Sequence, residues 1–268
     1  MKPIKSKVEL IKQGTGLKGV FSQIERAGRT TYNSINRIRE GSAEPFVNTL
    51  KKNKHNATLE HGTIYLQTAL KDVYGKYECN PYSVICSSMQ GNDKFITTNY
   101  RVIIENGWED DLQYLCEPTP HHERRYTLSF ITSRAIANEF VRHRCFSFMQ
   151  ESTRWCNYKK ELFGGQIRCV IPTAIKPNTT QYFQWEKAME HVEHWYIELL
   201  ENRVKLEVAR DLLPLGLKTE LIMTGTSTEW YNFFKLRCAN DAHPDARYLA
   251  EKAREIIHEE EEQYDTER

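Results

Sequence analysis

Residues 126–154 constrain the fold of this chain more than any other segment, because three patterns follow one another without a break. Residues 126–130 have the composition of a β-strand. Ser133 can then cap a helix whose apolar residues continue to Val141. The polar residues 150–154 come after this helix and predict a loop. The order of strand, helix and loop therefore delivers the last residues of the helix to one place at the end of a strand.

The residues delivered there are basic. In the expected helix Glu139, Arg142 and His143 lie on one face, spaced i, i+3 and i+4. The segment that follows reads RHRCFSFMQESTR and combines three arginines and a histidine with hydroxyl and amide side chains, namely Arg142, His143, Arg144, Ser147, Gln150, Ser152, Thr153 and Arg154. Guanidinium groups and hydroxyls in a tight loop bind phosphate well, so the segment favours a phosphorylated ligand. A solvated basic helix end explains the charge alone equally well.

At these residues the chain resembles the flavin-dependent thymidylate synthases, the ThyX family. The signature of that family is RHR, seven residues and then Ser, and here it stands as Arg142 to Arg144, the segment 145–151 and Ser152. Arg154 supplies the further arginine that the family has two residues after the serine. We call residues 142–154 the signature segment.

Four further blocks resemble the family in the same order along the chain, at 29–34, 58–66, 209–219 and 232–243. The resemblance implies an α+β fold, in which one domain over residues 1–268 has a central antiparallel sheet flanked by helices. It also implies a homotetramer whose active sites are shared between subunits.

The resemblance also assigns site residues. It implies that dUMP contacts Glu139, Arg142, Gln150, Ser152, Thr153, Arg154, Arg210 and Arg237. It implies that FAD contacts His61, Thr63, Arg142, His143, Arg144, Thr226, Thr228 and Asn232. No metal ligand is expected.

The implied reaction converts dUMP to dTMP, with 5,10-methylenetetrahydrofolate as the one-carbon donor and reduced FAD, regenerated by NADPH, as the reductant. No cysteine nucleophile is expected, because Cys145 and Cys238 stand at positions that the resemblance treats as variable. Arg237 is the expected catalytic residue, since a fixed guanidinium can polarise the uracil imide and stabilise negative charge on the pyrimidine. The protein would otherwise orient the ligands.

Two positions depart from the family and keep other functions open. Glutamine is commoner where Glu139 stands, and glutamate is commoner where Gln150 stands. The exchange alters which ligand atoms meet a donor or an acceptor. A related flavin and folate enzyme that modifies another pyrimidine nucleotide is therefore an alternative. A nucleotide- or RNA-binding module, based on the arginines and aromatic residues, is a more distant one.

Composition excludes several classes of protein. A formal net charge of +1 argues against bulk nucleic-acid binding, which needs a markedly basic surface. The seven cysteines are scattered and form no CxxC pair, so we expect reduced thiols in a cytoplasmic protein and neither disulfides nor a zinc site. We expect no signal peptide and no membrane span, because no apolar stretch is long enough.

The remaining segments give expectations for structure alone. Within 67–126, an insertion-like part, we expect strands at 82–88 and 94–104, a turn at 90–93 and then a short helix. The apolar spacing from Thr180 to Leu213 predicts one long helix that packs in the core or at a subunit interface and stops at Pro214. Arg210 would lie in its last turn, where the helix dipole favours a cation even without a ligand. Residues 259–268 are expected to be a flexible acidic tail.

Overall fold

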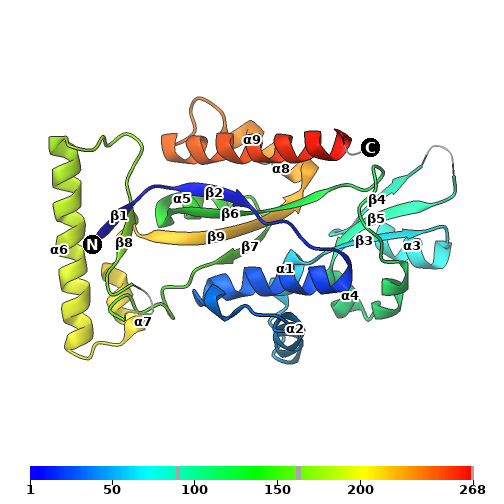
Figure 1. Ribbon diagram of the computed structural model, residues 1–268, viewed down its shortest axis with the longest axis horizontal. Coiled ribbons are helices and arrows are strands. Elements are labelled where there is room, and N and C mark those ends of the chain that lie inside the picture. The colour runs from blue at the N-terminus through cyan, green and yellow to red at the C-terminus, as the bar shows by residue number, and fades with distance from the viewer. Residues whose placement is uncertain (89–90, 161–163, 267–268) are drawn as a thin grey trace.

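A four-stranded antiparallel sheet forms the centre of the molecule (Figure 1). The computed structural model describes residues 1–88, 91–160 and 164–266. The strand order in this sheet is β2-β6-β9-β7, and every neighbouring pair is antiparallel. The strands are β2 (Lys7–Leu10), β6 (Arg125–Ser133), β7 (Ser147–Gln150) and β9 (Lys218–Thr226). The expected α+β class with a central antiparallel sheet is confirmed.

Helices cover both faces of the sheet, as expected. Because side chains alternate along a strand, Leu128, Phe130, Leu221 and Met223 lie on one face, in the largest apolar core. That face is covered by α5 (Arg134–Phe140), α8 (Ser227–Arg237) and α9 (Pro244–Thr266), and we call it the α8 face. The opposite face packs against α1 (Gly16–Thr31), and we call it the α1 face (Figure 1).

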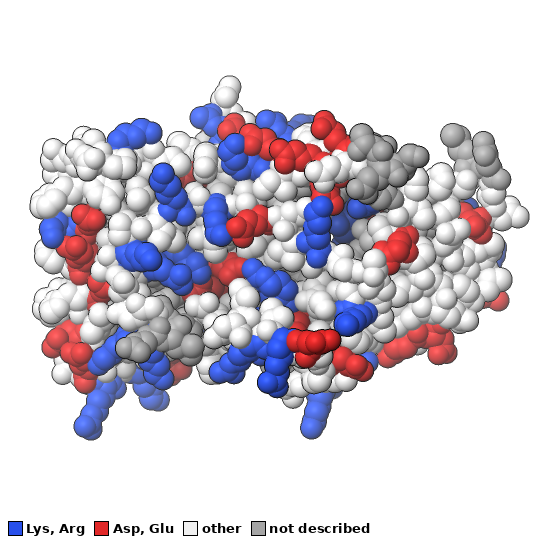
Figure 2. Space-filling view, in the orientation of Figure 1, with Lys and Arg blue, Asp and Glu red and all other residues white. Residues whose placement is uncertain are grey.

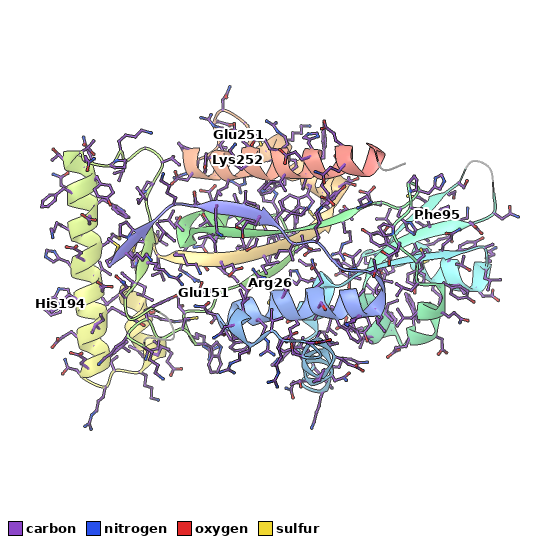
Figure 3. All side chains as sticks on the ribbon, viewed as in Figure 1. Arg26, Phe95, Glu151, His194, Glu251 and Lys252 are labelled. Atoms are coloured by element: carbon purple, nitrogen blue, oxygen red, sulfur yellow. The ribbon has the colours of Figure 1, made fainter. Side chains whose placement is uncertain are left out.

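The α1 face is polar at its centre. Arg26 of α1 donates from Nη2 to Glu220 Oε1 at 2.6 Å, and Ser129 Oγ donates to the same oxygen at 2.9 Å. In Figure 3 Arg26 extends from α1 towards the sheet. The Glu220 carboxylate is almost buried, so the second hydrogen bond helps to offset the loss of water around it.

A second sheet of three strands, in the order β3-β5-β4, lies at one end of the molecule (Figure 1). Its strands are β3 (Thr63–Thr68), β4 (Val84–Ser87) and β5 (Lys94–Asn99), and the helices near it are α2 (Ala43–Lys52), α3 (Lys71–Glu78) and α4 (Tyr100–Asn106). The expected hairpin is present as β4 and β5. Gln90, in the expected turn, lies outside the described residues.

The expectation of a strand over the whole of 94–104 is wrong. The strand ends at Asn99, and residues 100–106 form α4. The side chain of Asn99 accepts a hydrogen bond from the backbone N–H of Val102 and so caps the helix, which is the preferred role of asparagine at a helix start. The apolar residues after it suited either structure, and the cap decided between them.

The expected single helix from Thr180 to Leu213 is also interrupted. Helix α6 (Thr180–Glu201) ends before Arg203, whose φ of +63° is left-handed, and a short α7 (Leu206–Ala209) and the 3₁₀ turn Arg210–Leu212 follow. Arg210 therefore starts a turn and does not end the long helix. On α6 only Tyr196 is fully buried, whereas Phe183 and Trp195 are each 58% exposed.

The N-terminus and the C-terminal helix complete the fold. Strand β1 (Lys2–Ile4) pairs in parallel with β8 (Arg168–Val170) near α6. The acidic run 259–262, expected in a flexible tail, belongs to α9. Within it Glu260 pairs with Lys12 at 2.5 Å, and Glu261 accepts a hydrogen bond from the Tyr126 hydroxyl at 3.3 Å. The acidic residues thus contact the segment before α1 and the start of β6.

Acidic and basic side chains are interspersed over the face seen in Figure 2. Within the described residues, no helix is both long enough and apolar enough to cross a membrane.

Candidate active site

The guanidinium of Arg237 is held between the ends of two helices on the α8 face. Its Nη1 donates to Glu139 Oε2 at 2.7 Å, its Nη2 donates to the Glu139 carbonyl at 2.7 Å, and its Nε donates to His143 Nε2 at 2.9 Å. Glu139 lies in the last turn of α5, His143 follows that helix, and Arg237 is the last residue of α8. We call these three residues the arginine clamp.

The helix before the clamp forms for the expected reason. The Ser133 hydroxyl accepts from the backbone N–H of Ile136 at 3.3 Å and caps α5 where β6 ends. Phe140 is fully buried against Phe130 and Phe233, so the end of α5 is fixed to both the sheet and α8. This packing places Glu139 and His143 beside Arg237.

His143 is a neutral acceptor in this arrangement. Burial, and then the positive charge of Arg237, lower the pKa of His143 to about 4. Because Arg237 Nε carries a hydrogen, the facing His143 Nε2 must accept, and the ring proton must lie on Nδ1. The ring also packs edge-on against Phe233, with centroids 4.9 Å apart. His143 therefore orients Arg237 without adding a second positive charge near neutral pH.

The signature segment continues as an edge strand and then a turn. The expectation of a loop over 150–154 is wrong at its first residue, because Gln150 is the last residue of β7 and pairs with Leu221. Its side chain lies on the α8 face and donates to Thr219 Oγ1 at 3.3 Å. After it, the Ser152 N–H donates to the Thr31 carbonyl at 3.0 Å, which ties the turn to the end of α1.

Three arginines of the signature segment are open to solvent. Arg142, Arg144 and Arg154 are exposed, and none of them forms an ion pair with any part of the chain that the structure describes. The Arg154 N–H donates to Ser152 Oγ at 3.3 Å, and Thr153 is buried beneath them. Exposed guanidinium groups without a carboxylate partner are available to an anionic ligand.

A buried ion pair supports this turn, and sequence reasoning missed it. The Lys218 ammonium at the start of β9 binds Glu151 Oε2 at 2.5 Å, and both side chains are almost completely buried. Figure 3 places Glu151 between the end of α1 and the segment near α7. Glu151 lies inside the RHR-to-Ser spacing, but a variable position between two assigned residues carries no signal of a buried partner 67 residues away.

His61 and Thr63 lie on the other side of the sheet from the clamp. His61 ends the 3₁₀ helix Asn56–His61, and its Nδ1 lies 2.8 Å from Thr224 Oγ1 on the α1 face. Burial, and then the charge of Arg125, lower the pKa of His61 to about 3. Its Nε2 has no hydrogen-bond partner in the described part of the chain. The Thr63 backbone exchanges two hydrogen bonds with the Gln13 side chain, at 2.8 and 2.9 Å.

The other expected flavin contacts lie around the start of α8. The Thr226 hydroxyl caps this helix and forms a capping box with Glu229. The Thr228 N–H donates to Glu123 Oε1 at 2.9 Å, and Thr228 is exposed. Asn232 is also exposed, one helical turn further along. Arg210 is half-buried in its 3₁₀ turn, next to Ala209 of the core that also holds Cys156.

The expected site residues thus form separate groups within one chain. The arginine clamp brings Glu139, His143 and Arg237 together on the α8 face. The expectation that Arg142 and His143 continue the helix is wrong, because α5 ends at Phe140, and Arg142 is exposed outside the clamp. The turn at 151–154 lies at the edge strand β7, and His61 lies on the α1 face. Among the described residues, no group of three or more histidine, cysteine or acidic residues is placed to hold a metal ion.

The chain matches one family model and is similar to several named proteins. The family model described as thymidylate synthase complementing protein matches residues 99–261, which is more than half of the chain. The flavin-dependent thymidylate synthase of Synechocystis sp. is 32% identical over 143 residues, covering 49% of this chain and 65% of that protein. The flavin-dependent thymidylate synthase of Pyrococcus abyssi is 33% identical over 125 residues, covering 47% of this chain and 50% of that protein.

The match therefore spans between half and two thirds of the length of these curated relatives. Among solved structures, the UMP/dUMP methylase PolB from Streptomyces cacaoi, bound with 5-Br UMP, has a TM-score of 0.47 and 15% sequence identity, covering 97% of this chain and 92% of that chain. A likeness at this level carries no conclusion about the site.

Proposed function

Because the chain belongs to the family of thymidylate synthase complementing proteins, we propose that it is a flavin-dependent thymidylate synthase that converts dUMP to dTMP. The curated relatives that carry this function by name support the proposal. The observation that carries it is the arginine clamp, because a guanidinium fixed by two helices beside the basic signature segment suits a pyrimidine nucleotide.

Arg237 is the proposed catalytic residue. A guanidinium has five N–H donors, and Glu139 and His143 take three of the five, which leaves two for a ligand. We assign these two to the uracil imide, where they would stabilise the negative charge that develops on the ring. A preformed donor in a site that excludes water can lower such a barrier by several kcal/mol.

Glu139 affects both the charge of Arg237 and the choice of ligand. Its carboxylate neutralises part of the charge of Arg237 and holds the guanidinium plane in place. Since Glu139 accepts where a glutamine would also donate, it selects a ligand atom that can donate a hydrogen bond, such as the N3–H of uracil. This complementarity favours uracil over cytosine, whose N3 carries no hydrogen.

The phosphate of dUMP is assigned to the turn after β7. Ser152, Thr153 and Arg154 offer hydroxyls and a guanidinium there, and the Lys218–Glu151 pair fixes the turn from below. Gln150, Arg142 and Arg210 complete the proposed set of nucleotide contacts. Arg210 follows Ala209, which packs in one core with Cys156, just after this turn.

The residues present fit a flavin dinucleotide. Arg142 and Arg144 are exposed guanidinium groups that can bind its pyrophosphate, and Thr228 and Asn232 are exposed polar groups at the start of α8. His61, Thr63, His143 and Thr226 complete the proposed flavin contacts. When bound and reduced, FAD supplies the electrons for the reaction, and 5,10-methylenetetrahydrofolate and NADPH are the proposed cosubstrates.

No cysteine need act as a nucleophile. Burial raises the pKa of both Cys145 and Cys238, so both thiols stay protonated near neutral pH and are poor nucleophiles. We further propose a cytoplasmic, single-domain subunit, which suits seven free cysteines. Assembly into a homotetramer with shared sites is part of the proposal, because the contacts for one flavin lie on opposite faces of one sheet.

The test follows the flavin and the product together. The purified protein is incubated with FAD, its visible spectrum is recorded, and the reduced protein is mixed without oxygen with methylenetetrahydrofolate and either dUMP or dCMP. We expect bound flavin, its reoxidation on mixing, and dTMP formed from dUMP alone.

Two variants sharpen this test. Arg237→Gln removes the clamp guanidinium and should lower turnover by about a hundredfold or more. Lys235→Gln removes an exposed positive charge two residues earlier on the same helix and should leave turnover unchanged. A protein that binds no flavin, or that turns over only dCMP, contradicts the proposal.

A further inference from the structure

A groove lined by arginines lies between the end of α1 and α2, apart from every site residue assigned above. It has a volume of about 670 Å³, and its lining includes Arg29, Arg37, Arg39, Glu40, Phe46 and Thr49. The groove is formed by the last turns of α1, by the connection 36–42, and by the first turns of α2. We call it the arginine groove.

The floor of the groove is rigid. Gly28 has no side chain, and a Cβ at that position would lie 2.8 Å from the ring of Phe46, so only glycine lets Phe46 pack onto α1. The guanidinium of Arg29 then stacks on Phe46, 4.5 Å from its ring centroid. Arg29 Nε and Nη2 both donate to Glu25 Oε1, at 3.1 and 2.8 Å, and Glu25 is buried.

The two arginines at the rim are held by their backbones and not by their charges. The Arg37 N–H donates to the Ser34 carbonyl at 3.0 Å, and the Arg39 N–H donates to Ser42 Oγ at 3.0 Å. Ser42 in turn donates to Glu25 Oε2 at 2.8 Å, which joins the rim to the floor. Both arginine side chains are exposed, and neither forms an ion pair with any described residue.

The charges of the groove do not cancel. Glu25 neutralises Arg29, and Glu40 is the one carboxylate in the lining to set against Arg37 and Arg39. Arg37 and Arg39 both line the groove, and neither pairs with Glu40, so the lining keeps an excess of positive charge. Their guanidinium groups keep all their side-chain donors for a ligand.

We propose that the arginine groove is a second anion site, which binds the phosphate groups of a small phosphorylated molecule. Guanidinium groups bind phosphate through paired hydrogen bonds, and two on one rim match a diphosphate better than a single charge does. The volume lies within the range of small-molecule sites. The partly exposed plane of Arg29 offers a stacking surface for a planar ring attached to the phosphates.

This site goes beyond the proposed function, since no assigned nucleotide or flavin contact lines it. The end of α1 nevertheless connects the two regions. Thr31 accepts the hydrogen bond from Ser152, and the rings of Tyr32 and Trp155 lie 5.8 Å apart. A ligand in the arginine groove would therefore contact the helix that supports the phosphate turn of the signature segment.

Inorganic pyrophosphate is the probe for the test, and its binding to the purified full-length chain is measured by calorimetry at low salt. We compare the wild type with the double variant Arg37→Gln/Arg39→Gln. The control is Lys71→Gln/Lys205→Gln, which removes two exposed charges elsewhere that form no ion pair with any described residue. The rim variant should lose one binding site per chain, or bind at that site at least about tenfold more weakly. The control should bind as the wild type does.

Two results would overturn the proposal. The first is equal pyrophosphate binding by the rim variant and the wild type. In that case pyrophosphate would bind to basic residues outside the groove, such as those of the signature segment. The second is rim-dependent binding of a triglutamate peptide without rim-dependent binding of pyrophosphate, since that would make the groove a carboxylate site. The measurement needs neither flavin nor turnover, so it is independent of the proposed function.

Discussion

Replacing His61 with asparagine should make the protein less sensitive to acid. His61 is fully buried, and its Nδ1 lies 2.8 Å from Thr224 Oγ1. Asparagine can place its amide where Nδ1 lies and so retain a hydrogen bond to Thr224, but it does not titrate. The comparison therefore separates the protonation of His61 from the loss of its contact.

The magnitude follows from the pKa of His61, which falls from 6.5 to about 3 in the folded protein, first because of burial and then because of Arg125. Because the folded pKa is the lower one, the unfolded state takes up a proton first as the pH falls through 6.5, and acid favours unfolding. Between pH 7.5 and pH 5 this linkage removes about 2 kcal/mol of stability.

Urea unfolding of the protein without added flavin, followed by fluorescence at pH 7.5 and pH 5, measures the effect. The fall in unfolding free energy between the two pH values should be smaller in His61→Asn than in the wild type by about 2 kcal/mol. His55→Asn, which replaces an exposed histidine six residues earlier, controls for the loss of an imidazole. An equal pH dependence in the wild type and His61→Asn would refute the reasoning, because it would mean that His61 takes up its proton equally in both states.

Two further predictions concern the charges around the signature segment. Lys218→Met leaves the buried carboxylate of Glu151 without its cation and should lower the free energy of unfolding, measured in urea, by about 3 to 5 kcal/mol. The double variant Lys218→Met/Glu151→Leu should regain most of this stability. A loss much smaller than about 3 kcal/mol in Lys218→Met would contradict a paired, buried carboxylate. Arg237→Gln should raise the pKa of His143 from about 4 while burial keeps it below 6.5, as followed by NMR titration of the ring nitrogens, and an unchanged pKa would mean that Arg237 does not lie beside the ring.

Local patterns predicted local structure well. Ser133 caps α5 because serine before an apolar helical period has one common role. The composition of 126–130 likewise predicted a strand, and these five residues are buried within β6. Asn99 shows where the same reasoning stops. A run of aromatic and β-branched residues suits a strand or a buried helix equally, so only Asn99, as a possible helix cap inside the run, could have indicated where the strand ends and α4 begins.

The prediction of one long helix from Thr180 to Leu213 was wrong for a different reason. The apolar spacing continues past Glu201, but the chain turns at Arg203, where the backbone is left-handed in a residue that gives no such signal. Neither glycine nor proline marks the break. Contacts with the core around Tyr196 fix the turn instead, and such contacts are not visible in a window of sequence.

The candidate site was predictable where its partners are close in sequence and not where the sheet separates them. Helical spacing predicted Glu139 and His143 on one face, and both contact Arg237, although α5 ends at Phe140 and His143 lies in the turn after it. The family resemblance alone pointed to Arg237, 94 residues after His143. Glu151 and Lys218 meet only because β7 pairs with β9 in one register, so no local pattern could reveal them.

Side chains alternate between the two faces of the sheet, and this alternation limits which residues of one chain can contact the same ligand. On β9, Thr224 points to the α1 face and hydrogen-bonds to His61, while its neighbour Met223 points into the core of the α8 face. Contacts assigned to one flavin therefore lie on both sides of a packed sheet, and no rotation of side chains can bring them together. If all of these residues serve one ligand, they must come from more than one copy of the chain. Mixing Arg237→Gln with His61→Asn should then restore activity that neither variant has alone, because some sites in the mixture would receive both native residues.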